Sequence, residues 1–325
     1  MHNHFHAPDL GLSSALSGAE TAQLLPWSEL TQELAAVSQA EGIQVPPRIV
    51  MALPHGASLF CMPASDDAIA ITKLITLTPG NVHAQLPTIQ GEITIFDIAT
   101  GRRMLVIDGP TVTARRTAAI SVLAAQHIAP LPSAPLLILG AGVQGQAHLE
   151  AFVDQAGTEE VWIASRSASS VSRLLRHAQQ LGVRAYAVTN LQSALERCPN
   201  IVTCTSAREI VLRDPIHPQA FVAAVGAFTP HMAEVAPALV QRIARDGVVL
   251  VDTSEAEEEA GDLLQAGLDV ASFPTLAQCL AAKSARPAGP VLFKSCGWGG
   301  WDLAAARLAS RLYRHSRASG PDNGR

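Results

Sequence analysis

A glycine-rich turn between an apolar run and a helical pattern is the segment of this sequence best suited to chemistry. The apolar run Leu136–Leu139 leads directly into Gly140-Ala141-Gly142-Val143-Gln144-Gly145, and a helical pattern follows from about Gln146. In such a G-x-G-x-x-G turn the first glycine permits a tight turn, the second admits a pyrophosphate, and the third lets the helix pack closely on the strand. The free N–H groups at the helix start attract phosphates. The alternative is an ordinary glycine-rich turn, which the strand–turn–helix context argues against. We predict a dinucleotide site with contacts from Gly140, Gly142, Val143, Gln144 and Gly145.

The end of the next predicted strand bears on which dinucleotide would bind. Sites for NAD usually carry Asp or Glu there, to accept hydrogen bonds from the ribose hydroxyls. This chain instead has Ser165-Arg166-Ser167, which lies 25 residues after Gly140 and contains no carboxylate. Arg166 could pair with a 2′-phosphate while Ser165 and Ser167 donate hydrogen bonds, or Arg166 could simply begin a solvated helix. We predict NADPH as the preferred cofactor, with NADH as the second candidate.

Basic residues are few within residues 1–130, so their positions are informative. Arg48 follows two prolines, Lys73 lies inside the apolar run Ala68–Leu77, and Arg116 lies in an Ala-rich helical pattern. A lysine within an apolar strand is costly unless it meets an anion. Each of these residues, taken singly, could equally form a structural ion pair or extend to the surface.

The composition narrows the classes of protein. The chain has 325 residues, 48% of them hydrophobic and 16% charged, with a formal net charge of −5. These values exclude a disordered protein and give no reason to expect nucleic acid or an anionic membrane as partner. The acidic run from Glu255 to Glu259 is typical of a solvated surface rather than of a metal site.

Cysteine usage and the chain start bear on location. Five cysteines without a C-x-x-C pair favour a reducing compartment and predict neither disulfides nor a zinc site. No segment approaches ~20 continuous apolar residues, and no signal-peptide pattern is present. We therefore expect a cytoplasmic protein. His2, His4 and His6 lie in a terminal segment and are not predicted to bind metal.

The elements that would position these residues change in type along the chain. Residues 19–40 have a helical pattern broken at Pro26, and residues 43–107 contain short apolar runs that predict a largely antiparallel sheet. Examples of these runs are Ile49–Leu53, Ser58–Met62, Ala68–Ile75 and Glu92–Asp97. An Ala-rich helix over Val112–His127 then leads to a Pro-rich linker.

Beyond the linker, apolar strands alternate with helical patterns, which predicts a parallel sheet covered on both faces. The expected strands are Leu136–Leu139, Val161–Ala164, Val183–Val188, Ile201–Thr205, Phe221–Val225 and Val248–Val251. The predicted fold class is thus α/β, with a Rossmann-type doubly wound parallel sheet and a second α+β domain. We place the second domain at residues 1–130, completed by a C-terminal helix within 301–325, and the Rossmann domain at residues 131–300.

Several segments resemble the ornithine cyclodeaminase/μ-crystallin family over roughly residues 20–315. They occur in the family's order, and the segment from Arg116 to Ser121 (R-T-A-A-I-S) is quite specific. The matching segments are Pro47-Arg48, Ile71–Lys73, Pro79–Asn81, Gly91–Gly101, Thr113–Ser121, Gly140–Gln144, Val225–Ala227, Phe293–Gly297 and Asp302–Ala305.

The resemblance implies a homodimer in which a substrate-binding and dimerisation domain accompanies a Rossmann domain, and a substrate that is a small α-amino or α-imino acid. By position, Arg48, Lys73 and Arg116 would hold the substrate carboxylate, which suits the bidentate binding of Arg. Thr88 matches a family position near the substrate or nicotinamide. Thr117, Thr205, Val225, Gly226 and Ser295 would contact the cofactor.

One position departs from the cyclodeaminase pattern. Cyclodeaminases have an acidic residue two positions after the glycine that aligns with Gly226, where it acts as a base, and this chain has Phe228 there. Phenylalanine cannot take a proton, so oxidation of an amine lacks its expected base. Reduction of a preformed cyclic imine needs no such base, and Phe228 could pack against the substrate ring or simply belong to the core.

We therefore expect reduction of Δ1-pyrroline-2-carboxylate to L-proline and of Δ1-piperideine-2-carboxylate to L-pipecolate, with Lys73 as the candidate proton donor. The alternatives are ornithine cyclodeaminase, an alanine-dehydrogenase-like activity, and a non-catalytic, NADPH-dependent binder of small ligands of the μ-crystallin type.

Overall fold

The protein divides into two compact units, each of which is described by itself. A computed structural model describes residues 15–84, 86–205, 209–282 and 285–318. Unit 1 contains the described residues of 1–25, 42–112 and 302–325, and unit 2 those of 26–41 and 113–301. The division falls at residue 112 rather than at the predicted 130. The reason lies in the long helix α3 (Gly109–Ile128), whose Ser121 and Gln126 form hydrogen bonds with His148 and Gln155 of unit 2.

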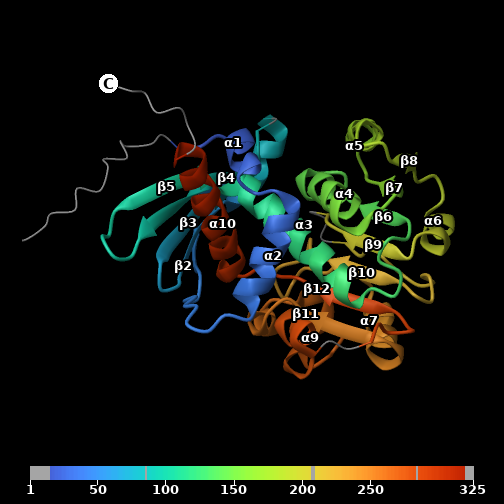
Figure 1. The fold of residues 1–325 in the computed structure, drawn as a ribbon. Helices are drawn as coiled ribbons and strands as arrows, with labels where there is room; N and C mark the ends of the chain where they lie inside the picture. The colour runs from blue at the N-terminus through green and yellow to red at the C-terminus, as the bar shows by residue number, and fades with distance from the viewer. Residues whose placement is uncertain (1–14, 85, 206–208, 283–284, 319–325) are drawn as a thin grey trace, which may run out of the picture. The chain divides into compact units, whose positions relative to one another are not determined.

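Unit 1 is built on a five-stranded antiparallel meander, with the strands in chain order (Figure 1). The predicted antiparallel sheet is confirmed. Its fifth strand, Arg103–Asp108, was not among the examples named from the sequence, because it begins and ends on charged residues and is defined by its pairing with β4. The elements of unit 1 are α1 (Gly18–Gln23), β1 (Ile49–Ala52), β2 (Ser58–Ser65), β3 (Ile69–Leu77), β4 (Ile89–Asp97), β5 (Arg103–Asp108) and residues 302–318 of α10 (Gly299–Ala318).

The side chains of β3 alternate between a buried and a more open face, as a half-buried strand requires. Ile69, Ile71, Lys73 and Ile75 are all buried. Two ion pairs, Lys73 to Asp302 and Asp66 to Arg307, join this part of the sheet to α10. Figure 1 shows α10, in red, running along the same sheet.

Unit 2 contains a seven-stranded parallel sheet in the order β11-β12-β10-β9-β6-β7-β8. This order is that of a doubly wound sheet, so the predicted fold class is confirmed. The strands are β6 (Leu136–Leu139), β7 (Glu160–Ala164), β8 (Arg184–Ala187), β9 (Asn200–Thr203), β10 (Phe221–Ala224), β11 (Val248–Val251) and β12 (Val291–Lys294).

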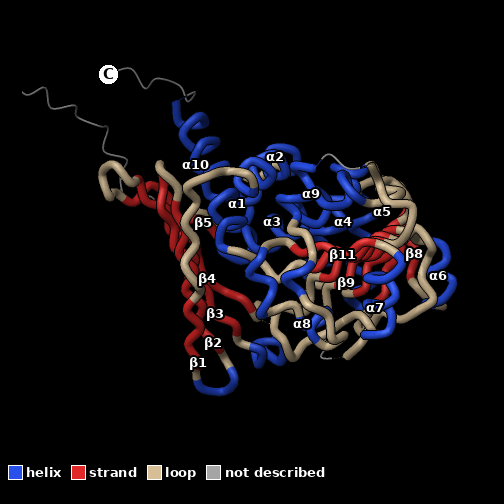
Figure 2. Tube along the Cα trace, turned by 90° about the horizontal axis from the view of Figure 1, so that it is seen from below, coloured by secondary structure: helices blue, strands red, loops and turns tan. Residues whose placement is uncertain are grey.

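Helices cover both faces of this sheet. Figure 2 shows α4 and α5 on one face and α6 and α7 on the other. Leu195 of α6 and Leu239 of α7 share one buried cluster with Leu137 and Val222 of the sheet, so the core on that face is continuous. The helices of unit 2 are α2 (Trp27–Ser38), residues 113–128 of α3, α4 (Val143–Ala156), α5 (Ala168–Gln180), α6 (Leu191–Arg197), α7 (Pro237–Asp246), α8 (Gly261–Leu264) and α9 (Leu276–Ala282).

Two features near the C-terminal end differ from the sequence prediction. The strand β12 (Val291–Lys294) was not expected, because a run of three apolar residues followed by a lysine does not distinguish a strand from a helix by periodicity. Helix α10 begins at Gly299, two residues before the predicted C-terminal helix, 301–325. Among the described residues, no helix is long and apolar enough to cross a membrane.

Candidate functional site

The parallel sheet of unit 2 has its topological switch point at β6. This strand lies between β7 and β9, and the chain leaves β6 toward one side of the sheet and later returns on the other. In doubly wound sheets, ligands bind at the carboxyl ends of the strands at such a point. The glycine turn 140–145 lies directly after Leu139, the last residue of β6. The sequence-predicted site and the site expected from the topology therefore coincide.

The three glycines of the turn differ in what surrounds them. Gly140 has φ +124°, and a Cβ there would lie 2.6 Å from the carbonyl oxygen of Cys204. A Cβ at Gly145 would collide with the carbonyl oxygen of Gly140, so the helix packs as closely as predicted. A Cβ at Gly142 would meet nothing within 4 Å. The first and third glycines are thus required by the protein itself, while the second leaves room for a ligand.

The start of α4 presents the N–H groups expected of a phosphate site. Gly142 is the N-cap residue, and no side chain caps the helix. The first N–H groups of a helix have no partner within the helix, so those of Val143 and Gln144 suit a pyrophosphate. The side chain of Gln144 is engaged elsewhere, since its Nε2 donates to the carbonyl oxygen of Thr113 at 3.4 Å. These residues fit a dinucleotide.

The segment after β7 carries the predicted cofactor-selecting residues. Arg166 is exposed, and no carboxylate occurs at Ser165, Arg166 or Ser167. Ser167 also has a structural role, because its Oγ caps α5 by accepting a hydrogen bond from the N–H of Ser170 at 3.2 Å. The hydroxyl oxygen of Ser167 is therefore already engaged in capping α5.

The polar groups at the ends of β9, β10 and β12 bind two buried carboxylates that sequence reasoning did not identify. The N–H groups of Thr205 and Gly226 donate to Glu234, at 2.6 and 2.7 Å. Ser295 Oγ donates to Asp252 Oδ2 at 2.8 Å. Three predicted cofactor residues, Thr205, Gly226 and Ser295, are thus held in place from within the protein. No sequence pattern links these residues to Glu234 and Asp252, because the partners are distant in sequence.

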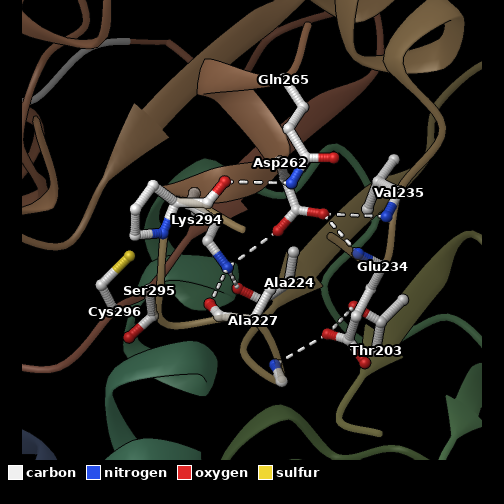
Figure 3. A network of polar contacts seen from close by, with 12 residues as sticks. Thr203, Ala224, Ala227, Glu234, Val235, Asp262, Gln265, Lys294, Ser295 and Cys296 are labelled. Atoms are coloured by element: carbon white, nitrogen blue, oxygen red, sulfur yellow. Dashed lines mark hydrogen bonds and ion pairs between the residues drawn. The ribbon is translucent and has the colours of Figure 1, made fainter. Parts of the chain in front are cut away.

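A buried ion pair lies behind Glu234 (Figure 3). Lys294 Nζ is 2.9 Å from Asp262 Oδ2, and both side chains are fully buried. Burial is the largest single influence on the pKa of Lys294 and would lower it, but the charge and hydrogen bond of Asp262, together with Cys296 and Glu234, outweigh burial and the pKa is raised. Lys294 is therefore a cation, and its charge offsets that of Asp262.

His148 connects α4 to α3 beside the glycine turn. Its Nδ1 is 2.8 Å from the carbonyl oxygen of Gln144, and its Nε2 is 3.0 Å from Ser121 Oγ. A carbonyl only accepts, so Nδ1 carries the proton. Ser121 Oγ, the partner of Nε2, also lies 3.0 Å from the carbonyl oxygen of Thr117, to which it can donate. Burial lowers the pKa of His148 to about 4. The imidazole is therefore neutral, and Ser121 of the R-T-A-A-I-S segment has a structural partner.

Within unit 1, the buried lysine predicted from the sequence meets an anion of the same unit. Lys73 is 1% exposed, and its Nζ lies 2.7 Å from Asp302 Oδ2. Sequence reasoning had placed Asp302 only in a matching segment and had given it no role. Arg48, half-buried, precedes β1, and Thr88, also half-buried, precedes β4.

The remaining predicted substrate residues belong to unit 2. Arg116 is buried in α3, and a Cβ at Gly297 would come within 3.1 Å of its guanidinium. Thr117, next to it, donates its hydroxyl proton to the carbonyl oxygen of Thr113 at 2.7 Å. Phe228 is half-buried in the loop after β10, so it is not a fully buried core residue.

Glu234 does not replace the base that is missing at position 228. It is fully buried, and its two oxygens accept four hydrogen bonds, from Thr203 Oγ1, Thr205 N, Thr205 Oγ1 and Gly226 N. A carboxylate so engaged has no free position for a substrate proton. Among the described residues, no cluster of three His, Cys, Asp or Glu could hold a metal ion, and the histidines at 2, 4 and 6 lie outside those residues.

A family model described as the ornithine cyclodeaminase/mu-crystallin family matches residues 18–314, nearly the whole chain. The chain belongs to this family. Family members with curated names include Delta(1)-pyrroline-2-carboxylate reductase 1 of Burkholderia multivorans, which is 37% identical and aligns over 92% of this chain and 96% of its own. The Delta(1)-pyrroline-2-carboxylate/Delta(1)-piperideine-2-carboxylate reductase of Azospirillum brasilense is 35% identical, over 92% of this chain and 96% of its own.

A solved structure of similar fold is that of the Thermococcus litoralis Delta(1)-pyrroline-2-carboxylate reductase in complex with NADH and L-proline. Its TM-score is 0.85 at 24% identity, covering 94% of this chain and 98% of that one. At this identity the likeness shows the fold alone.

Proposed function

We propose that the chain is a nicotinamide-dependent reductase of cyclic ketimines, converting Δ1-pyrroline-2-carboxylate to L-proline and Δ1-piperideine-2-carboxylate to L-pipecolate. The observation that carries the proposal is Phe228, two positions after Gly226, where the family resemblance places the base of the cyclodeaminases. Without that base the family's amine-oxidising reaction is disfavoured, whereas imine reduction does not need it. The names of the relatives at 35–37% identity support the same reaction.

The cofactor site is proposed at the glycine turn and the neighbouring strand ends. Gly142 and the uncapped start of α4 support pyrophosphate binding there. When bound, the reduced nicotinamide supplies the hydride that the imine carbon accepts. Arg166 supports a preference for NADPH over NADH, since an exposed guanidinium suits a 2′-phosphate and no carboxylate follows β7.

The protein's own residues would fix the substrate and supply a proton. We assign the substrate carboxylate to Arg48, Lys73 and Arg116, and the proton for the imine nitrogen to Lys73. Asp302 holds Lys73 Nζ at 2.7 Å, so the ammonium has a defined orientation. A fixed carboxylate orients the imine, and such orientation supplies a large part of the rate in enzyme reactions.

We also propose that the chain forms a homodimer through the open face of the five-stranded sheet. On that face, Ile49 of β1, Cys61 of β2 and Leu74 of β3 lie in one row across the strands. Ile49 is 64% exposed and Leu74 43% exposed. An apolar row on an exposed sheet is typical of an interaction surface.

The decisive experiment is a turnover assay of the purified chain with Δ1-pyrroline-2-carboxylate and NADPH. We expect oxidation of NADPH that requires the imine and forms L-proline, faster than with NADH run in parallel. The six-membered ring imine is tested in the same way.

Three control reactions test the rival activities. Ammonia release from ornithine would indicate a cyclodeaminase, and turnover of pyruvate with ammonia would indicate a dehydrogenase of alanine. Tight ligand binding with no turnover of any of these substrates would contradict the proposal and favour a binding protein.

A further inference from the structure

Glu234 is a fully buried carboxylate in the segment between β10 and α7. Its Oε1 accepts hydrogen bonds from Thr205 N at 2.6 Å and Thr205 Oγ1 at 2.8 Å. Its Oε2 accepts from Thr203 Oγ1 at 2.8 Å and from Gly226 N at 2.7 Å (Figure 3). One side chain thus binds both chain segments that leave the neighbouring strands β9 and β10.

Glu234 packs closely against the backbone at Gly226. A Cβ at Gly226 would collide with the Glu234 carboxylate and with the carbonyl oxygen of Thr205. Gly226 is therefore a glycine because the carboxylate approaches its backbone from inside the protein. The two strand ends and the carboxylate form one close-packed group.

Glu234 is itself fixed by a second carboxylate. Its backbone N–H donates to Asp262 Oδ1 at 2.7 Å, and Asp262 Oδ2 pairs with Lys294 Nζ at 2.9 Å. Lys294 ends β12, so three strands are joined through two carboxylates and one ammonium. Burial raises the pKa of Glu234, while the hydrogen bond from Thr205 N and the charge of Lys294 act in the opposite direction.

We propose that Glu234 is a positioning residue for the cofactor. It fixes the backbone at Thr205 and Gly226, the two strand ends that the proposed function, on which this inference rests, assigns to cofactor binding. Glu234 touches neither substrate nor cofactor in this role, because its side chain is fully buried behind them.

The chemistry of the site requires a carboxylate rather than an amide. All four partners of Glu234 donate, and only a carboxylate can accept from both sides. In Glu234→Gln the amide NH₂ must face either Thr205 or Gly226. A hydroxyl can rotate to accept from that NH₂, but a backbone N–H cannot. One of the two backbone N–H groups therefore loses its acceptor whichever way the amide is placed.

The test compares Glu234→Gln with Glu160→Gln. Glu160 is a buried carboxylate at the opposite, amino-terminal end of a strand of the same sheet, where Arg197 and Trp162 donate to it. The dissociation constant of NADPH is measured by fluorescence titration without substrate. We expect the NADPH dissociation constant to rise about tenfold or more in Glu234→Gln, since a buried N–H without an acceptor destabilises the backbone at the two strand ends. In Glu160→Gln the same constant should change by less than about twofold.

Hydrogen exchange in the protein without cofactor gives a second readout. The amide of Thr205 or of Gly226 should exchange faster in Glu234→Gln than in the wild type, while Glu160→Gln leaves both unchanged. Equal affinity for NADPH in wild type and Glu234→Gln would overturn the inference, as would equal losses in both variants.

A milder variant covers the case in which Glu234→Gln does not fold. Thr203→Val removes one hydroxyl donor from Glu234 and leaves both backbone donors in place. We expect a threefold or so rise in the NADPH dissociation constant, and an unchanged value would count against the inference. Because binding is measured without substrate, a wild type that binds NADPH but fails to reduce the imine contradicts only the proposed reaction.

Discussion

Lys73 is a cation on the buried face of an otherwise apolar strand, and its environment depends on Asp302. Both side chains are almost fully buried, and their charged groups are 2.7 Å apart. Removing one partner of a buried ion pair leaves the other charge in a low-dielectric environment. The pair therefore couples the predicted proton donor to α10.

Lys73→Met should destabilise the protein by about 3–5 kcal/mol, because Asp302 would keep a buried charge without its ammonium partner. Lys73→Met combined with Asp302→Asn should cost less than the sum of the two single changes. Unfolding in urea measures all three. Strict additivity would show that the two residues are not coupled.

The other ion pair between the sheet and α10 provides the matched control. Arg307 pairs with Asp66 at 2.9 Å, but the Arg307 side chain is 36% exposed. Asp66 is itself buried, yet it keeps hydrogen bonds from the N–H groups of Ala68 and Ile69. Arg307→Met should therefore cost less than Lys73→Met. The role of Lys73 in proton transfer is read separately, from kcat at saturating imine. A fall of about 10²–10⁴-fold is expected for a general acid, and normal turnover in Lys73→Met would exclude that role.

At the scale of elements, the pairing of α3 with α4 fixes the helix that begins the phosphate site. His148 of α4 lies between the carbonyl oxygen of Gln144 and the hydroxyl of Ser121 on α3, and it is fully buried. Burial opposes a charge on the imidazole, so the pKa of His148 is lowered to about 4. Protonation of His148 therefore opposes the packing of α3 on α4.

The stability of the protein should fall as the pH drops from about 6.5 to about 4. In this window the unfolded chain binds a proton at His148 and the folded chain does not, so protons favour unfolding. Across this window His148 alone should lower the free energy of unfolding by about 3 kcal/mol in total. Above and below the window its contribution should not change with pH. Urea unfolding at several pH values measures it.

His148→Gln is the control for this pH dependence, because glutamine does not titrate. Its stability should be lower near neutral pH but should fall less steeply across the window. Wild-type and variant curves that run parallel from pH 6.5 to pH 4 would show that His148 is not responsible.

At the scale of the whole molecule, one face of the five-stranded sheet packs against α10 and the opposite face is open. The face with Lys73 packs against α10 through two ion pairs. The opposite face exposes Ile49 and Leu74, and β1 is an edge strand whose residues are all exposed. An apolar face beside an open edge favours self-association.

Leu74→Lys should convert a dimer into a monomer, because a charge in the middle of an apolar interface is left without a partner. Light scattering after size exclusion should give twice 34.1 kDa for the wild type and 34.1 kDa for the variant. Leu181→Lys is the matched control, since Leu181 is 40% exposed and ends α5 in unit 2. A monomeric wild type, or equal effects of both changes, would contradict the proposed interface.

The sequence by itself determined those parts of the fold that depend on local pattern. The strand–turn–helix over 136–156 was predictable because the glycine spacing falls between an apolar run and a helical pattern. The structure shows crowding at Gly140 and Gly145 and open space at Gly142. The parallel sheet was predictable from alternation of strands and helices. The strands β5 and β12 were not, since their runs are short and only pairing with neighbours defines them.

Only the tertiary structure showed which carboxylates hold the site residues. Glu234 and Asp302 lie 29 and 229 residues from Thr205 and Lys73, the residues they bind, so no spacing rule connects them. Sequence reasoning recognised that Lys73 needs an anion and that Phe228 cannot be a base, because both follow from the chemistry of a single side chain. Which buried acceptor satisfies which donor is decided by packing, because it depends on groups that meet only after the chain has folded.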